Sequence, residues 1–275
     1  MDFKEKLISS FMVFEQDIDL SNPVHEIRSK SLKKFEEKGF PNKKQEAWKY
    51  TSLAKILKSD YGIFPKKEVT IELKDVQKYF LYEMDTYKIV FIDGIYSPFL
   101  SDTTHDGLDV CLLSAALTNP KYKSLINKYF NKISDKKDSL TLLNTSFSIE
   151  GAYIYLPKSV TAEKPIEIMH FSTGKQGDFF LQPRNLIIVE ENAEVQILER
   201  HQSLSNHRPF TNSVTEIYAK DSSRIDYYKI QNDREEAYLI DNTYISQNKK
   251  SNVHVHTFSF GGEITRNNLN FYQNG

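Results

Sequence analysis

Apolar side chains recur at helical spacing at the start of the chain. Between residues 1 and 20 they fall every three or four positions and predict an amphipathic helix. This stripe consists of Phe3, Leu7, Phe11, Phe14 and Ile18. A second helix is predicted directly afterwards, since Asn22 suits an N-cap, Pro23 the first helical position and Gly39 the stop.

A mixed pattern begins at about residue 62. The stretch YKIVFIDGIYSPFL holds two β-branched and aromatic runs around Asp93 and Gly94, a dipeptide that suits a two-residue turn, and it predicts a β-hairpin. The stretch LLSAALTNPKYKSLINKYF predicts helix on both sides of a break at Pro120. Before the mixed pattern, TSLAKILKSDYG predicts a short helical turn capped by Thr51 or Ser52.

Beyond Ser148 the pattern changes to short strands separated by polar turns. Four segments follow the order strand, polar turn, strand, and the first apolar residues after the turns are 29, 30 and 28 residues apart. These residues are Ile166, Val195, Ile225 and Val253. A near-constant step favours a β-solenoid over a Greek-key sandwich, whose loop lengths vary freely. Such coils bury their apolar faces only by stacking on one another.

These changes divide the chain into a helical amino-terminal region (1–60), a mixed α/β segment (61–147) and a β-helix core (148–275). The last residues, GGEITRNNLNFYQNG, keep a strand pattern without a helix or charged tail to cap the stack. We therefore expect that the chain is a fragment truncated at its carboxyl end, or that another chain, for example in a homodimer, completes its last coil.

Charge and composition exclude several function classes. The sequence has 36 Lys and Arg against 37 Asp and Glu, so no global basic field recruits nucleic acid or anionic lipid. No apolar run reaches the length of a signal peptide or a membrane span. We expect a soluble, cytoplasmic protein that is not inserted in a membrane. The sequence has neither a GxxxxGK[ST] loop nor GxGxxG, so we expect no ATP hydrolysis by this chain itself.

Few residues suggest metal binding. In VHVHTFSF, His254 and His256 share one face of a predicted strand and could supply two metal ligands, but third and fourth ligands are not visible. Because Phe258 and Phe260 share that face, we expect another element or subunit to cover it. The single cysteine, Cys111, is interpreted as a small buried hydrophobic residue rather than a reactive thiol.

Other polar clusters receive structural interpretations. The stretch LERHQSLSNHRPF is interpreted as a solvated, mobile loop between coils. It contains Glu199, Arg200, His201, His207 and Arg208. Glu199 and Glu216 lie in strand contexts, but the sequence does not supply the separation that paired catalytic carboxylates require. In GFPNKKQEAWKYTSL, Trp48 is predicted to anchor a short amphipathic helix on the mixed segment while neighbouring lysines stay solvated.

That stretch also resembles the amino-terminal signature of the SufB/SufD family of iron–sulfur cluster assembly scaffolds, in which a proline, a glutamate and a Trp-Lys-Tyr-Thr run precede the core. Further similar blocks follow in the family's order: IVFIDGIYSPFLS, LLNTSFSIEGAYIYLPKSVTAEKPIEI, PRNLIIVEENAEVQILE, NSVTEIYAKDSSRIDYYKIQ and GGEITRNNLN. The similarity runs from about residue 39 to the last residue. The amino-terminal helices and the single cysteine make the chain more similar to SufD than to SufB.

The resemblance implies a right-handed parallel β-helix preceded by an α-helical region and a small α/β segment. It also implies a non-catalytic scaffold subunit that acts with a SufB-like partner and a SufC-like ABC ATPase. An iron–sulfur cluster or its precursors are implied for the whole complex, and no cofactor is expected on this chain alone. The family's cluster-assembly residue and ATPase contact lie in a carboxyl-terminal region without counterpart here, so no catalytic or cluster-ligating residue is assigned, Cys111 included.

Two other classes stay open. A carbohydrate-active β-helix enzyme would share the architecture, although the sequence shows no secretion signal and no Asp-rich calcium pattern. A self-associating structural protein would agree with an uncapped last coil.

Overall fold

The computed structural model describes residues 2–16, 23–65, 69–81, 83–103, 107–134 and 137–275. Its helices are α1 (Phe3–Gln16), α2 (Pro23–Lys38), α3 (Leu73–Val76), α4 (Leu113–Thr118), α5 (Lys123–Tyr129) and α6 (Ser139–Phe147). Its strands are β1 (Tyr87–Ile92), β2 (Ile95–Tyr96), β3 (Asp109–Leu112), β4 (Ala152–Leu156), β5 (Ile166–Ser172), β6 (Phe180–Leu181), β7 (Arg184–Val189), β8 (Glu194–Ser203), β9 (Phe210–Ala219), β10 (Arg224–Asp233), β11 (Tyr238–Gln247), β12 (Asn252–Gly261) and β13 (Ile264–Gln273).

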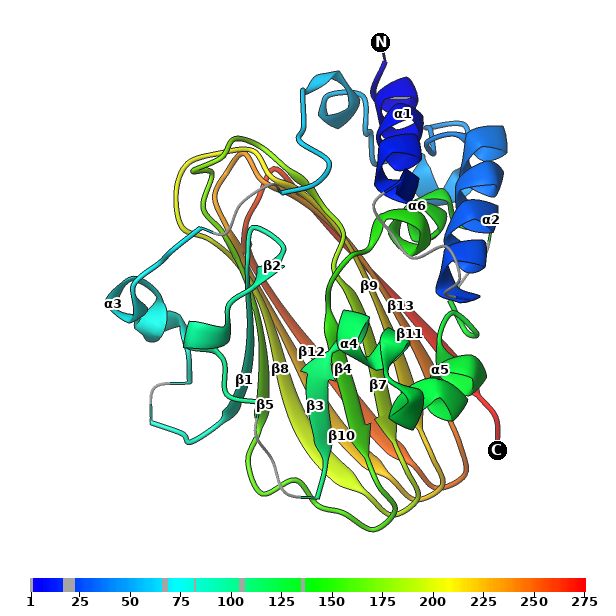
Figure 1. Cartoon of the computed structure of the whole chain (residues 1–275), viewed down its shortest axis with the longest axis vertical. Coiled ribbons are helices and arrows are strands. Elements are labelled where there is room, and N and C mark those ends of the chain that lie inside the picture. The colour runs from blue at the N-terminus through cyan, green and yellow to red at the C-terminus, as the bar shows by residue number, and fades with distance from the viewer. Residues whose placement is uncertain (1, 17–22, 66–68, 82, 104–106, 135–136) are drawn as a thin grey trace.

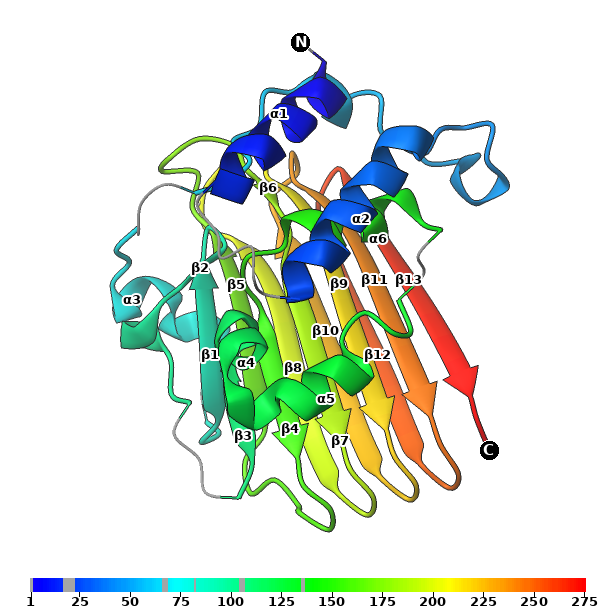
Figure 2. The same cartoon turned by 45° about the vertical axis from the view of Figure 1, so that its right-hand side comes forward.

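The strands form two sheets that enclose one core. One sheet has the order β12-β10-β8-β5-β1-β2 and the other β13-β11-β9-β7-β4-β3. From β4 onward the long strands alternate between the sheets, and each pairs in parallel with the strand one coil away. Figure 2 shows these coils stacked side by side. The predicted β-helix is therefore confirmed.

The register corrects one step of the predicted repeat. Val195 pairs with Ile225 and Ile225 with Val253, as the spacing predicts. Ile166, however, pairs with Ile197 and not with Val195, so the first step is 31 residues. The reason is local, because the connection between β4 and β5 is longer than the tight turns of the later coils.

The turns that connect the two sheets along one side of the solenoid repeat the same backbone geometry. A non-glycine residue adopts the left-handed conformation in each turn, with φ between 55° and 61°. These residues are Ser159, Asn192, Ser222 and Lys250. The first three donate their backbone N–H to a carbonyl of the next turn at 2.8–3.1 Å. The turns therefore extend the hydrogen-bond ladder of the sheets, which offsets the strain of the left-handed conformation.

Helices cover part of the outer face of each sheet. α4 and α5 lie over β4 and β7, where Leu113 and Ile126 pack against Leu186 and Ile188 (Figure 1). The α3 segment lies beside β1 and covers the outer face of the other sheet. The predicted hairpin is confirmed, and its first strand, β1, also pairs in parallel with β5 and so extends the solenoid sheet.

The amino-terminal helices cover the opposite side of the solenoid, away from these turns. Phe3, Leu7 and Phe11 of α1 are buried in one cluster with α2, α6 and the ends of β9 and β11. The second helix ends as predicted, since Gly39 follows it with φ of 68°. Ile18 and Asn22 lie outside the described residues.

Two local predictions need correction. The turn predicted after Thr51 or Ser52 is a 3₁₀-helix at Ile56–Lys58, and its N-cap position is Lys55, without a side-chain hydrogen bond. The sequence reading also missed α6, whose residues are all buried. A pattern of buried and solvated positions cannot reveal such a helix, since it packs between α2 and the solenoid and exposes no face to solvent.

Trp48 is an anchor, as predicted, but it packs against the solenoid strands as well as the predicted mixed segment. It is buried in the cluster formed by α1, α2, α6 and the solenoid strands. The guanidinium carbon of Arg266, on β13, lies 4.3 Å from the centre of its ring. Lys43, Lys44 and Lys49 are exposed, as expected. Trp48 therefore connects the amino-terminal region to the solenoid itself.

Candidate metal centre

The two histidines predicted from sequence lie on the outer face of β12. His254 and His256 are exposed, and their ring centres are 6.5 Å apart. His254 Nδ1 lies 2.9 Å from the carboxylate of Asp226. Phe258 and Phe260 on the same face are also exposed, so no described element of this chain covers the face. Cover by another subunit, and metal binding by this pair, stay predictions.

The segment interpreted as a mobile loop is a connection only from Leu204 to Pro209, and the prediction was wrong for its first part, which belongs to the buried strand β8. Glu199 and His201 of β8 are almost completely inaccessible. Side chains alternate along a strand, so Val195 and Ile197 share the inward face with Glu199 and His201. This two-residue alternation was the signal in the sequence that could have identified them.

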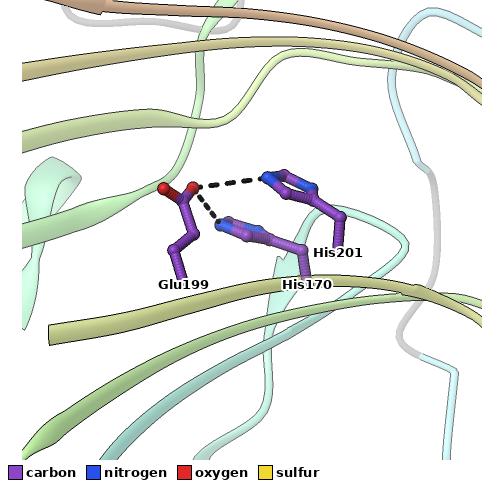
Figure 3. A group of neighbouring side chains, drawn as sticks. All are labelled: His170, Glu199 and His201. Atoms are coloured by element: carbon purple, nitrogen blue, oxygen red, sulfur yellow. Dashed lines mark ion pairs between the residues drawn. The ribbon is translucent and has the colours of Figure 1, made fainter. Parts of the chain in front are cut away.

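The structure brings Glu199 and His201 together with His170 of β5, a residue that the sequence reading did not consider. Glu199 Oε1 lies 3.4 Å from His170 Nε2 and 3.3 Å from His201 Nε2. Figure 3 shows both imidazoles directed at the same carboxylate oxygen. Among the described residues, this is the group of three His, Cys, Asp or Glu side chains whose ligand atoms lie within 4.8 Å of one another. We call these residues the His–Glu–His cluster.

Neighbouring side chains fix the orientation of the cluster. His170 and His201 are register partners on adjacent strands, so their rings stack with centres 4.6 Å apart, and Phe91 of β1 stacks on the other side of His170 at 5.1 Å. Asn185 donates a hydrogen bond of 3.0 Å to Glu199 Oε1, and the Tyr227 hydroxyl donates to the other carboxylate oxygen. The carboxylate and both rings are therefore held in position before any ligand binds.

Burial and mutual charge set the ionisation of the cluster. Burial lowers the pKa of His170 to about 4, so this imidazole is neutral at neutral pH. Burial also opposes a charge on His201, but the carboxylate of Glu199 outweighs it and raises the pKa of His201. Burial alone would raise the pKa of Glu199, yet the two imidazoles and Lys229 hold it well below its usual range.

The polar interior continues along the solenoid. Lys229 lies next to Glu199 in the same inward column of the sheet. Its ammonium contacts the carboxylate of Asp241 and donates 2.8 Å to the hydroxyl of Thr243. Lys229 and Asp241 are buried, so these charges are compensated by each other rather than by water.

A cavity leads to the cluster from the end of the solenoid near the β1–β2 hairpin. It has a volume of about 180 Å³, and its lining includes Phe91, Gly94, Glu150 and His170. A smaller cavity of about 20 Å³ reaches both His170 and His201, together with Asp233. The cluster is thus enclosed by protein and borders both cavities, the larger one through His170.

Glu150, on the wall of the larger cavity, should make stability depend on pH. Burial raises its pKa to about 6 from 4.5, against the opposing charge of Arg28. The folded state holds the proton of the Glu150 carboxyl more tightly than the unfolded state does. The contribution of this proton to folding stability is therefore fully present below pH 4.5 and is lost as the pH rises through about 6. A shift of this size is worth about 2 kcal/mol.

We therefore expect the free energy of unfolding of Glu150→Gln, taken relative to that of the wild type, to rise by about 2 kcal/mol when the pH is raised from 4.5 to 8. Urea unfolding of both proteins at the two pH values measures this difference. Glu235 is exposed in a turn, so Glu235→Gln provides a matched control that should follow the wild-type profile. A constant difference between wild type and Glu150→Gln across this range would contradict the prediction.

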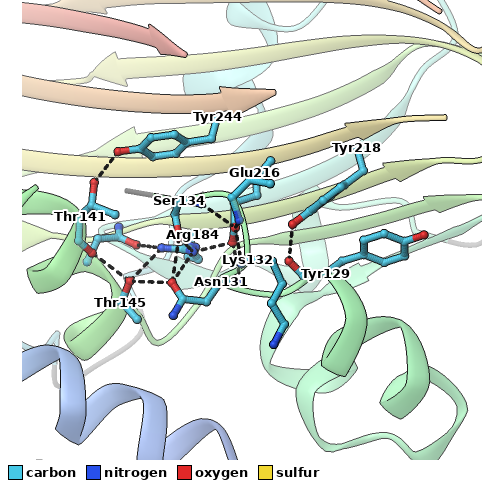
Figure 4. A network of polar contacts seen from close by, with 12 residues as sticks. Tyr129, Asn131, Lys132, Ser134, Thr141, Thr145, Arg184, Glu216, Tyr218 and Tyr244 are labelled. Carbon is cyan, nitrogen blue, oxygen red and sulfur yellow. Dashed lines mark hydrogen bonds and ion pairs between the residues drawn. The ribbon is translucent and has the colours of Figure 1, made fainter. Parts of the chain in front are cut away.

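A second buried charge pair lies on the outer face of the sheet and has a structural role. Arg184 Nη2 lies 2.5 Å from Glu216 Oε2, and both side chains are fully buried. Figure 4 shows this pair between the sheet and the segment that follows α5. Glu216 accepts hydrogen bonds of 2.8–3.2 Å from the backbone N–H groups of Asn131, Lys132, Ile133 and Ser134. Glu199 points from β8 into the interior of the solenoid, whereas Glu216 lies on the outer face of β9. The two carboxylates therefore do not form a catalytic pair.

Cys111 lies in β3 and is partly buried against the cluster formed by α4 and α5. Burial raises the pKa of its thiol to about 11, so the reactive thiolate is disfavoured. This agrees with its interpretation as a hydrophobic residue. In the part of the chain that the structure describes, no helix combines the length and the hydropathy needed to cross a bilayer.

The fold defines a parallel β-solenoid protein with a helical cover and a polar, charged interior. Comparison with family models gives its class: residues 1–168 match the SufBD protein N-terminal region. Residues 170–275 match the SUF system FeS cluster assembly, SufBD core domain. The chain therefore belongs to the SufB/SufD family of iron–sulfur cluster assembly proteins, and within it the chain is SufD-like.

Curated relatives agree with this assignment. An iron–sulfur cluster assembly SufBD family protein of Synechocystis is 26% identical over 243 residues, which cover 85% of this chain and 53% of the relative. The iron–sulfur cluster assembly protein SufD of Escherichia coli is 23% identical over 241 residues, covering 86% of this chain and 53% of the relative. The chain thus spans about half the length of these relatives.

Proposed function

We propose that this chain is a non-catalytic scaffold subunit of an iron–sulfur cluster assembly complex. In this proposal it acts as a SufD-like component beside a SufB-like subunit, and a SufC-like ATPase supplies ATP hydrolysis. The observation that carries the proposal is the match of both family regions, in order, over residues 1–168 and 170–275. The cluster or its precursors are cargo of the complex and not a resident cofactor of this chain.

The interior of the solenoid supports a scaffold role. Its buried charges are held by neighbouring side chains, with Lys229 on Asp241 and Glu199 on Asn185 and Tyr227. Such a preorganised framework suits a protein that holds its form while partners turn over nucleotide. A carbohydrate-active enzyme would instead present carboxylates to solvent in a cleft, and Glu199 and Glu216 are both buried.

Affinity purification from the cells that produce the protein tests the proposal. An affinity tag ahead of Met1 leaves the rest of the chain unchanged, and we expect a SufB-like subunit and an ABC-type ATPase to co-purify with it. The recovered complex should acquire iron and sulfide when supplied with Fe²⁺, sulfide and ATP. Recovery of neither partner from cells that express both would reject the proposal, and sizing of the purified protein would then separate self-association from a monomer.

A further inference from the structure

We propose that the His–Glu–His cluster binds one divalent first-row transition-metal ion inside the solenoid, through His170 Nε2, His201 Nε2 and the carboxylate of Glu199. This differs from the sequence-based expectation that the chain alone holds no cofactor. It does not depend on the proposed assembly function, because it rests on the geometry, burial and charge of these three residues.

Both imidazole nitrogens lack a hydrogen-bond partner. His170 Nε2 and His201 Nε2 are inaccessible, and although the carboxylate is close to each of them, neither contact has hydrogen-bond geometry. Burying such a group without a partner destabilises the folded protein. Two imidazole nitrogens directed at one carboxylate oxygen without a hydrogen bond to it form an arrangement that a cation site would contain.

The spacing of the ligand atoms suits a shared metal ion. Zinc lies about 2.0–2.1 Å from imidazole nitrogen and carboxylate oxygen, so two tetrahedral ligands are about 3.4 Å apart. The two observed nitrogen–oxygen distances are 3.4 and 3.3 Å. The imidazoles are stacked nearly parallel, so metal binding would require each ring to rotate out of the stack until its nitrogen lone pair points at the shared ion.

The charge inside the solenoid also favours a cation. Glu199 and Asp241 are buried carboxylates, and Lys229 is the buried ammonium between them. The carboxylates therefore outnumber the ammonium, and the groups beside Glu199 that can carry a compensating positive charge are the two imidazoles themselves. A divalent ion at the cluster would supply that compensation and would lie beside the cavity that reaches both histidines and Asp233.

The ligand types define the class of metal. Two imidazoles and one carboxylate are typical of Zn²⁺ and Fe²⁺ sites that keep an open coordination position, whereas Mg²⁺ and Ca²⁺ prefer sites made only of oxygen ligands. Asn185 and Tyr227 hold the carboxylate, as outer-shell partners do in metal centres. The cavity beside His170 supplies an entry path and room for an exchangeable ligand.

Titration of the purified, chelator-treated chain with Co²⁺ tests the proposal. We expect saturable binding of one equivalent per chain, intense visible absorption of a four- or five-coordinate ion, and displacement by Zn²⁺ with a rise in Tm. His170 lies at the edge of the cavity, so His170→Asn is the variant most able to keep the fold, and it should weaken Co²⁺ binding at least about tenfold.

His254→Ala/His256→Ala provides the matched control, because it removes an exposed histidine pair and leaves the cluster intact. It should bind Co²⁺ as the wild type does. The proposal is overturned if the wild type shows no saturable binding, if folded His170→Asn binds with unchanged affinity, or if the control variant loses the visible absorption. The far-UV circular dichroism and Tm of each variant show whether it is folded.

Discussion

Replacing Glu216 with glutamine is expected to lower the free energy of unfolding by about 3–5 kcal/mol, because it leaves Arg184 as a buried cation without its countercharge. The carboxylate also accepts four consecutive backbone N–H groups, from Asn131 to Ser134. A glutamine side chain has one oxygen to offer and places an NH₂ group where the other acceptor was. Urea unfolding of the wild type and Glu216→Gln measures the loss.

The exposed ion pair between Glu26 and Lys30 provides the control. Both of these side chains are 70% exposed, so Glu26→Gln should cost much less stability than Glu216→Gln. The double variant Arg184→Met/Glu216→Gln should cost less than the sum of its single variants, because no uncompensated arginine remains. A loss in Glu216→Gln no larger than that in Glu26→Gln would show that the buried pair does not hold the segment after α5 on the sheet.

Replacing Trp48 with alanine is expected to cost about 3–5 kcal/mol, as for other large buried aromatic side chains. The indole is only 5% exposed and packs among α1, α2, α6 and the solenoid strands. The change removes the ring that carries the Arg266 guanidinium at 4.3 Å. Since Arg266 belongs to β13, the loss should uncouple the amino-terminal region from the far end of the chain.

Tyr50 is a control from the same stretch of sequence, because its side chain is 89% exposed. Tyr50→Ala should change stability by no more than about 0.5 kcal/mol. Unfolding should be followed by far-UV circular dichroism, because Trp48 is the only tryptophan and its variant loses the fluorescence signal. Equal stability losses in the two variants would mean that Trp48 is not an anchor.

Local signals in the sequence predicted much of the fold. The stripe from Phe3 to Phe14 predicted α1, Pro23 and Gly39 predicted the extent of α2, and the dipeptide at Asp93 predicted the hairpin. These features depend on the conformational preferences of a few neighbouring residues. The repeat also predicted the solenoid, because stacked coils must place similar apolar residues at similar intervals.

The sites were harder to predict, because they join residues from different coils. His170 and His201 are 31 residues apart in sequence and become neighbours only through the register of β5 and β8. The polar cluster that contains Glu199 was interpreted as a solvated loop, although Glu199 itself lies in a strand context, and its partners Asn185 and Tyr227 come from other strands. The pairing of Glu216 with Arg184 likewise depends on how β7 and β9 are aligned.

The sequence by itself determined the type of coil, the family and the positions of the main helices, because hydrophobic period and turn chemistry act over a few residues. The tertiary structure alone decided which polar side chains are enclosed and which face solvent. Glu199 and His201 became interior residues because β8 continues through them, while His254 and His256 stayed outside on β12. Register and strand length set these outcomes, and both follow from packing between coils that lie far apart in the sequence.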